Sequence, residues 1–138
     1  MIEIGKVISS KPGNIIVLLD SIEVFERNKD RLRISRYVSI EDGNNANILA
    51  SIRDIAAVQS PNADTINYTV TCSPIGYYFD FDGVINFRQG GVNLPSPTEP
   101  AYLPDDVVIN SIFSSNQNFS LWLSLLISHA RKRYRQGQ

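Results

Sequence analysis

Before residue 110, short apolar stretches alternate with turn-forming residues, which is the pattern of a β-protein. In residues 65–73 every second residue is apolar, and residues 36–41 alternate in the same way. Successive side chains of a strand point to opposite faces, so each stretch predicts a strand with one buried face. Residues 3–9 alternate less regularly and predict a first strand.

Three further segments are less regular. Residues 14–20 form a continuous apolar run rich in β-branched residues, which predicts a strand. We interpret residues 21–25 as its continuation beyond a bulge, and the heavily charged residues 27–33 as an exposed loop. Residues 46–58 fit both helical and strand spacing, but the turn residues 42–45 before them favour a long strand.

Clusters of turn-forming residues separate the strands, at residues 11–14, 42–45 and 60–62. Asp82-Gly83 predicts another tight turn, between the aromatic-rich residues 76–81 and a short strand over residues 84–88. Several short strands at such spacing predict a small closed barrel or a sandwich. A barrel is favoured because closure leaves no edge strand exposed.

Residues 90–104 have a different composition, with two glycines and four of the seven prolines. Proline lacks a backbone N–H and fixes φ, so this segment predicts an extended strap rather than a strand within the ladder. After it, Asp105-Asp106 would cap a short helix that runs to Phe113. Apolar residues one turn apart predict a further helix over residues 119–134.

Together these elements predict a mainly β fold, a small five- or six-stranded β-barrel with a Pro-rich strap and a C-terminal helix. The length of 138 residues corresponds to one domain. The barrel would occupy residues 1–89, residues 90–113 would complete the barrel domain, and residues 114–138 would form a helical extension with a basic end. The expected core consists of Val7, Ile16, Leu18, Val38, Ile40, Ile52, Val70 and Phe87.

Charge is unevenly distributed along the chain. Thirteen Lys and Arg face fourteen Asp and Glu, a net charge of −1, which excludes a uniformly basic nucleic-acid coat protein. Four of the basic residues lie in the last eight positions, so the other 130 residues carry nine basic and fourteen acidic side chains. The chain therefore has an acidic body and a basic C-terminal end. The basic side chains at this end would complement the dipole of a helix, or they would contact phosphates or an acidic partner.

The sequence lacks the residues that most catalytic sites require, because it has one cysteine and one histidine. Cys72 is the single cysteine, so an internal disulfide and a thiolate metal cluster are excluded, and a reducing, cytoplasmic compartment is expected. His129 is the single histidine and lies in the C-terminal segment, far in sequence from Cys72. The start of the chain has no signal-peptide pattern, and no apolar run is long enough to span a membrane.

The sequence also contains no clear motif for binding a nucleotide or a metal ion. A Walker A motif is absent, so the chain is not expected to be an enzyme of the P-loop ATPase type. The pairs Asp80/Asp82 and Asp105/Asp106 are interpreted as a hairpin turn and a helix cap rather than as metal or acid–base sites. We therefore predict no catalytic residue, no cofactor and no metal.

Two groups of side chains are candidates for binding. The aromatic residues of segment 77–81, together with Phe87, could form a base-stacking platform, but such a platform normally lies in a cationic groove, and here Asp80 and Asp82 are neighbours. A barrel core with a protein-facing surface is the favoured interpretation. The interaction candidates are Tyr77, Tyr78, Phe79, Trp122, Leu126, Arg131, Lys132, Arg133 and Arg135.

Several segments, taken in order, resemble the N-terminal β-barrel of HerA-type ATPases, the HerA/ATP-synthase or HAS barrel. Residues 5–8 (GKVI) look like its opening strand, residues 33–41 (RISRYVSIE) like the segment that enters a short strand, and residues 48–53 (ILASIR) like the strand after it. Residues 91–113 resemble the Pro-rich strap that leads through an acidic pair and a short helix towards the ATPase core. The resemblance covers roughly residues 3–113.

The resemblance implies a role without catalysis in this segment. In that family the barrel lies at the head of a hexameric ATP-dependent DNA translocase, helps to assemble the ring and can dock a partner nuclease. It thus implies self-association, a possible nuclease partner, DNA contact that is weak or indirect, and no membrane. The alternative is a stand-alone barrel that binds single-stranded nucleic acid, with binding that is sensitive to salt. A small-molecule hydrolase ranks third, because no pocket residues point to it.

Overall fold

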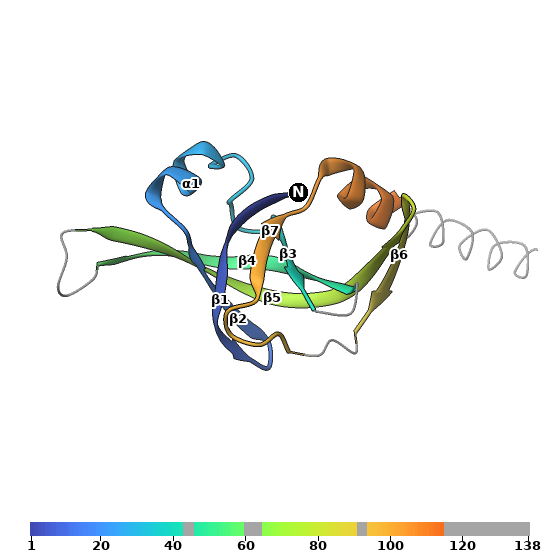
Figure 1. Cartoon of the computed structure of the whole chain (residues 1–138), viewed down its shortest axis with the longest axis horizontal. Helices are drawn as coiled ribbons and strands as arrows, with labels where there is room; N and C mark the ends of the chain where they lie inside the picture. The colour runs from blue at the N-terminus through green and yellow to red at the C-terminus, as the bar shows by residue number, and fades with distance from the viewer. Residues whose placement is uncertain (43–45, 60–64, 91–93, 115–138) are drawn as a thin grey trace, which may run out of the picture. The chain divides into compact units, whose positions relative to one another are not determined.

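The computed structural model describes residues 1–42, 46–59, 65–90 and 94–114 of the chain (Figure 1). The chain divides into two compact units, Met1–Asp105 and Asp106–Gln138. The first unit contains all the strands that the structure describes. The second contributes a helix over residues 106–114, which confirms the short helix predicted to follow the strap.

The first unit is a closed six-stranded antiparallel β-barrel with one additional strand. Hydrogen bonding joins the strands in the order β2-β1-β7-β3-β4-β5, and β2 pairs with β5 to close the barrel. The additional strand, β6, pairs with β5. The strands are β1 (Ile2–Lys11), β2 (Asn14–Leu19), β3 (Tyr37–Glu41), β4 (Ala46–Gln59), β5 (Ile66–Phe81), β6 (Val84–Gln89) and β7 (Pro100–Leu103). The predicted fold class is confirmed.

The long strand predicted over residues 46–58 is confirmed as β4. It pairs with β5 from Ala46 opposite Phe79 to Gln59 opposite Ile66, and Figure 1 shows the two strands side by side. The predicted turns at Gly13 and at Asp82-Gly83 are confirmed too, with positive φ values at these residues. Residues 43–45 and 60–62, assigned to turns, and residues 119–134, assigned to a helix, lie outside the described residues.

The barrel interior is apolar and sealed. Val7, Val38, Ile40, Ile52 and Val70 are buried there as predicted. The further members of this cluster are Ile4, Ile15, Val17, Leu19, Leu32, Ile48, Ala50, Cys72, Ala101 and Leu103. Burial of this apolar surface is the main term that stabilises the fold.

The predicted inward face of β2 was wrong by one residue. Ile16 and Leu18 are only half-buried, whereas Ile15 and Val17 are fully buried. Since residues 15–19 are apolar on both faces, no alternation indicates which face is buried, and a shift of one residue exchanges the faces. Pairing with β5 decides it, because Ile15 lies opposite Cys72 and Val17 opposite Val70. Phe87 was also misplaced: it lies half-buried on β6, outside the barrel.

Residues 21–25 were predicted to continue β2, and this prediction was wrong. They include the N-cap and the first residues of the helix α1 (Ile22–Arg27). Ser21 is its N-cap, and the Ser21 hydroxyl accepts a hydrogen bond from the backbone N–H of Val24. Val24 and Phe25 pack against the barrel core. The loop predicted after residue 27 is there, but Leu32 within it is buried.

The Pro-rich segment is not only a strap. Its residues Pro100–Leu103 form β7, which pairs with both β1 and β3 and so completes the barrel wall. Proline is tolerated as the first residue of a strand, which is the position of Pro100. The next proline, Pro104, comes directly after Leu103, the last residue of the strand. The prediction that this segment stays outside the ladder was therefore wrong for these four residues.

The face assignment of β2 can be tested with two neighbouring isoleucines. Replacement of the buried Ile15 by alanine should lower the free energy of unfolding by about 2–5 kcal/mol, because it leaves a cavity in the core. The same change at half-buried Ile16 is the matched control and should cost no more than about 1.5 kcal/mol. Urea unfolding of both variants gives the comparison, and equal losses would contradict the register.

Candidate interaction surface on the β5–β6 hairpin

The hairpin formed by β5 and β6 is built on a tight turn. Asp82 and Gly83 both have positive φ values, 51° and 85°, as a two-residue type I′ turn requires. A side-chain oxygen of Asp80 accepts a hydrogen bond of 3.1 Å from the backbone N–H of Gly83. The pair Asp80/Asp82 thus serves the turn, as predicted.

Three aromatic rings lie on one face of β5, at every second residue. Tyr77 and Phe79 meet edge to face, with ring centroids 5.5 Å apart. Phe79 and Phe81 stack, with centroids 5.9 Å apart and planes inclined by 7°. Such contacts hold the rings in fixed positions relative to one another. We call Tyr77, Phe79, Phe81 and the cross-strand neighbour Val84 the hairpin face.

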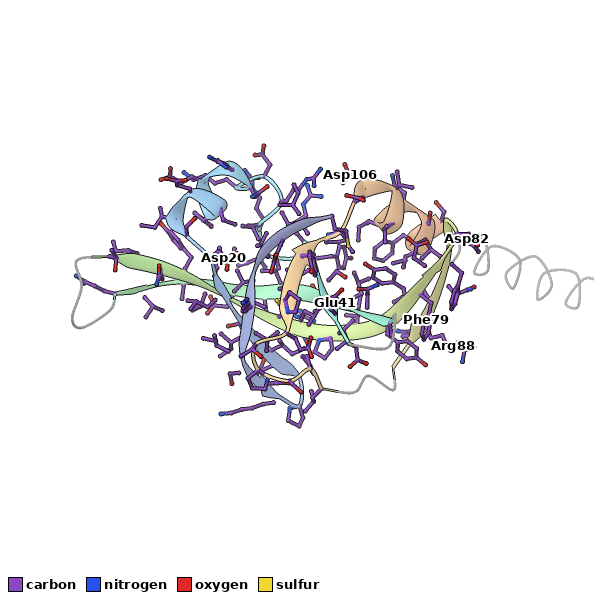
Figure 2. All side chains as sticks on the ribbon, viewed as in Figure 1. Asp20, Glu41, Phe79, Asp82, Arg88 and Asp106 are labelled. Atoms are coloured by element: carbon purple, nitrogen blue, oxygen red, sulfur yellow. The ribbon has the colours of Figure 1, made fainter. Side chains whose placement is uncertain are left out.

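The outer end of the hairpin face is exposed. Phe81 is 57% and Val84 61% exposed, and the two residues lie opposite each other across the hairpin. Further along β6, Asn86 is opposite Phe79 and Arg88 is opposite Tyr77. Figure 2 shows Phe79 and Arg88 on neighbouring strands, with Asp82 at the turn. The face is therefore apolar near the turn and carries one cation at its other end.

The hairpin face continues the wall that lines the barrel interior. Tyr77 is opposite Ile48 and Phe79 is opposite Ala46 in the pairing of β5 with β4, and directly paired residues point to the same side of a sheet. Ile48 belongs to the barrel core. The row of aromatic side chains thus begins beside buried residues and ends in solvent, so its outer part is accessible.

Tyr78 points to the opposite side of β5 and is buried. Its hydroxyl and that of buried Ser39 are 2.8 Å apart and hydrogen-bonded. The hydroxyl also donates to the sulfur of Met1, at 3.6 Å. Burial raises the pKa of Tyr78, the bond to Ser39 opposes this rise, and the carboxylates of Asp80 and Asp105 add to it. Tyr78 therefore stays neutral and structural.

The same buried side of the hairpin explains Gly76 and Phe87. Tyr78 lies opposite Phe87, and a Cβ at Gly76 would overlap the ring of Phe87 and the carbonyl of Arg88. Glycine is required there because the ring of Phe87 lies against the β5 backbone. Phe87 thus packs on the hairpin instead of the barrel core.

The structure divides the candidates of the sequence analysis. It places Tyr77 and Phe79 together on the half-buried part of the hairpin face and sends Tyr78 to the buried side. It places Phe81, already one of the platform aromatics, at the exposed end of this face, and it adds Val84. The spacing of Tyr77, Phe79 and Phe81 in the sequence is the signal that puts the three rings on one face. The remaining candidates, Trp122, Leu126, Arg131, Lys132, Arg133 and Arg135, lie outside the described residues.

The described residues offer little for covalent or metal chemistry. Cys72 is fully buried in the barrel, and desolvation raises the pKa of its thiol from 9.0 to about 12. A thiol in this state is a poor nucleophile, because the thiolate is the reactive form. Among the described residues, no three His, Cys, Asp or Glu side chains come together as metal ligands would. Within the same residues, no helix has the length and apolar character required to cross a membrane.

The Tyr78–Ser39 hydrogen bond can be measured by a double-mutant cycle. Replacing Tyr78 by phenylalanine should destabilise the protein by about 1–3 kcal/mol, because the buried Ser39 hydroxyl loses its partner. Adding Ser39→Ala should recover part of that loss. Tyr77→Phe is the control and should change the free energy of unfolding by less than about 0.5 kcal/mol. Additive single losses would show that the two hydroxyls do not interact.

Alkaline pH should reveal the burial of Cys72. Its pKa in the fold is raised above the unfolded value, so its contribution to stability is complete below about pH 9 and is lost as pH rises towards 12. In urea unfolding across this range, the wild type should lose about 1.4 kcal/mol per pH unit more than Cys72→Ala. Parallel pH profiles for the two proteins would contradict a buried, neutral thiol.

Comparison with protein-family models gives no match for this chain, and a search of curated proteins gives none either. The resemblance to the HerA-type barrel therefore rests on the sequence segments that carry it.

Proposed function

We propose that this chain is a non-catalytic assembly and docking module, the N-terminal barrel of a HerA-like ATP-dependent DNA translocase. In this role it would contribute to ring assembly, associate with further copies of itself and dock a partner nuclease in the cytoplasm. The observation that carries the proposal is the hairpin face, whose outer end at Phe81 and Val84 is exposed. The resemblance of residues 3–113 to the HAS barrel supplies the family, and the barrel architecture is in keeping with it.

A sealed barrel supports binding by the outer surface rather than chemistry inside. The interior is filled by aliphatic side chains, and its one nucleophilic group, Cys72, is protonated and inaccessible. Among the described residues, Phe81 and Val84 form an exposed apolar pair, because they lie opposite each other on the hairpin. Paired exposed aromatic and aliphatic side chains on a supported strand are typical of protein contacts.

One observation favours the second candidate, a barrel that binds single-stranded nucleic acid. Arg88 lies on the same face as the rings of Tyr77 and Phe79, and stacking rings beside a cation are the elements of a base-binding platform. Against it, this cation has Asp80 and Asp82 on the same hairpin, and the chain before its basic end has an excess of acidic residues. A phosphate backbone is repelled by such a surface.

Self-association is tested by making the hairpin face polar. Phe81→Ser with Val84→Thr should lower the average mass in sedimentation equilibrium at high protein concentration, while the melting temperature stays close to the wild-type value. Ile34→Ser is the matched control, since Ile34 is 63% exposed in a different part of the barrel unit. If the wild type is already a monomer at every concentration, the proposed self-association is wrong.

Fluorescence anisotropy with a labelled single-stranded oligonucleotide separates the two candidates. The assembly module should bind weakly or not at all at low salt. Saturable binding that weakens with salt, and weakens again when Arg131, Lys132, Arg133 and Arg135 are neutralised together, would favour the nucleic-acid-binding barrel instead.

A further inference from the structure

β6 is the one strand of the described sheet with an unpaired side. The six barrel strands form a closed ring, because β2 pairs with β5, whereas β6 is bonded to β5 alone. Its outer side therefore carries backbone donors and acceptors that no described strand satisfies. Such an edge is a template for another strand.

Hairpin geometry identifies which backbone groups point outwards. In a two-residue hairpin the residues that flank the turn, Phe81 and Val84, form a hydrogen-bonded pair, and pairs of this kind recur at every second residue. The backbone N–H and C=O groups of the even-numbered residues of β6 thus point to β5. The hydrogen bond from the N–H of Gly90 to the carbonyl of Ile75 agrees with this pattern. The N–H and C=O groups of Ile85, Phe87 and Gln89 then point to the open edge.

β6 lacks most of the features that keep natural edge strands apart. It contains no proline and a single charged residue, Arg88, and it pairs with β5 without a register shift. Natural edges are usually protected by several charges, a proline or a bulge. An edge of six residues without these features is suited to pairing.

We propose that the partner of this edge is a second copy of the same chain, joined by antiparallel β6–β6 pairing about a two-fold axis at Asn86. The outward-pointing groups then bond Ile85 of each copy to Phe87 of the other. Asn86 lies opposite Asn86, and Val84 lies opposite Arg88. A two-fold contact of this kind uses one surface twice and closes on two copies.

Charge complementarity selects a second copy as the occupant and the antiparallel direction. Arg88 lies near the open end of the hairpin, and Asp82 lies in its turn. Antiparallel pairing brings the Arg88 end of each copy to the acidic turn of the other, whereas parallel pairing would set the two arginines side by side.

Apolar contact selects the register. With Asn86 opposite itself, Ile85 packs against Phe87 of the second copy on one face, twice by symmetry. A register with Phe87 opposite itself leaves Ile85 opposite polar Gln89, and a register with Ile85 opposite itself leaves Phe87 opposite Gly83 in the turn. Cross-strand apolar pairs contribute to stability, so the first register is favoured.

The inference rests on the proposed self-association and adds to it a contact with defined residues. Because the contact closes on two copies, it joins barrels in pairs and does not itself build a ring. In the joined sheet the hairpin faces of both copies lie on the same side, since directly paired residues point the same way.

Disulfide trapping tests the register. Asn86→Cys should form a disulfide-linked dimer under mild oxidation, because Cα atoms of a pair at this position are about 4.5 Å apart, within the range that a disulfide spans. Arg88→Cys is the matched control: both positions are exposed on β6, but residue 88 would lie opposite Val84 and should cross-link little. Buried Cys72 can remain in both variants. Non-reducing gels and sedimentation equilibrium of the unmodified chain are the measurements.

The outcomes separate the inference from the proposed function. A cross-linked dimer with Asn86→Cys and little with Arg88→Cys, together with dimers of the unmodified chain, supports the pairing. Self-association without preferential cross-linking at residue 86 overturns the β6–β6 contact but leaves the proposed assembly role standing. A chain that remains monomeric at all concentrations overturns both.

Discussion

The rest of the structure depends on the way that β5 changes its partner. Over residues 69–72 it pairs with β2 and closes the barrel, and from Gly76 onwards it pairs with β6. The change occurs at a register shift in the pairing with β4, where Ile75, between Pro74 and Gly76, has no partner residue, and an irregularity of this kind bends a strand. Closure stabilises the aliphatic interior, and the redirected half of β5 becomes a hairpin supported by β4 on its other side.

This division of β5 gives its residues different roles. Cys72, in the closing half, is sealed in the core and has a raised pKa. In the hairpin half, alternation sends Tyr78 to a buried hydrogen bond with Ser39, while Tyr77, Phe79 and Phe81 run from the interior wall into solvent. β5 therefore carries the aromatic side chains of the hairpin face and also pairs with β6, the strand whose outer edge is unpaired among the described strands.

In two segments of this chain, the local sequence pattern and the tertiary pairing favour different structures. Residues 21–25 contain apolar, β-branched side chains typical of strands, but Ser21 could cap a helix, and packing of Val24 and Phe25 on the barrel decided for the helix. Pro100 and Pro104 suggested a strap, yet proline is compatible with the start of a strand and the position after its end. Residues 100–103 form a strand because they pair with β1 on one side and with β3 on the other.

The number and type of most strands and the tight turn at Asp82-Gly83 could be predicted from the sequence, because they depend on local periodicity and on residue identity. Which face of β2 is buried depends on tertiary pairing, since residues 15–19 are apolar on both sides and the pairing with β5 directs Ile15 and Val17 inwards. The tertiary structure also decided that Tyr78 is buried while Phe81 is exposed, because burial depends on which strands and side chains lie over each position, and strand pairing across distant parts of the chain sets that.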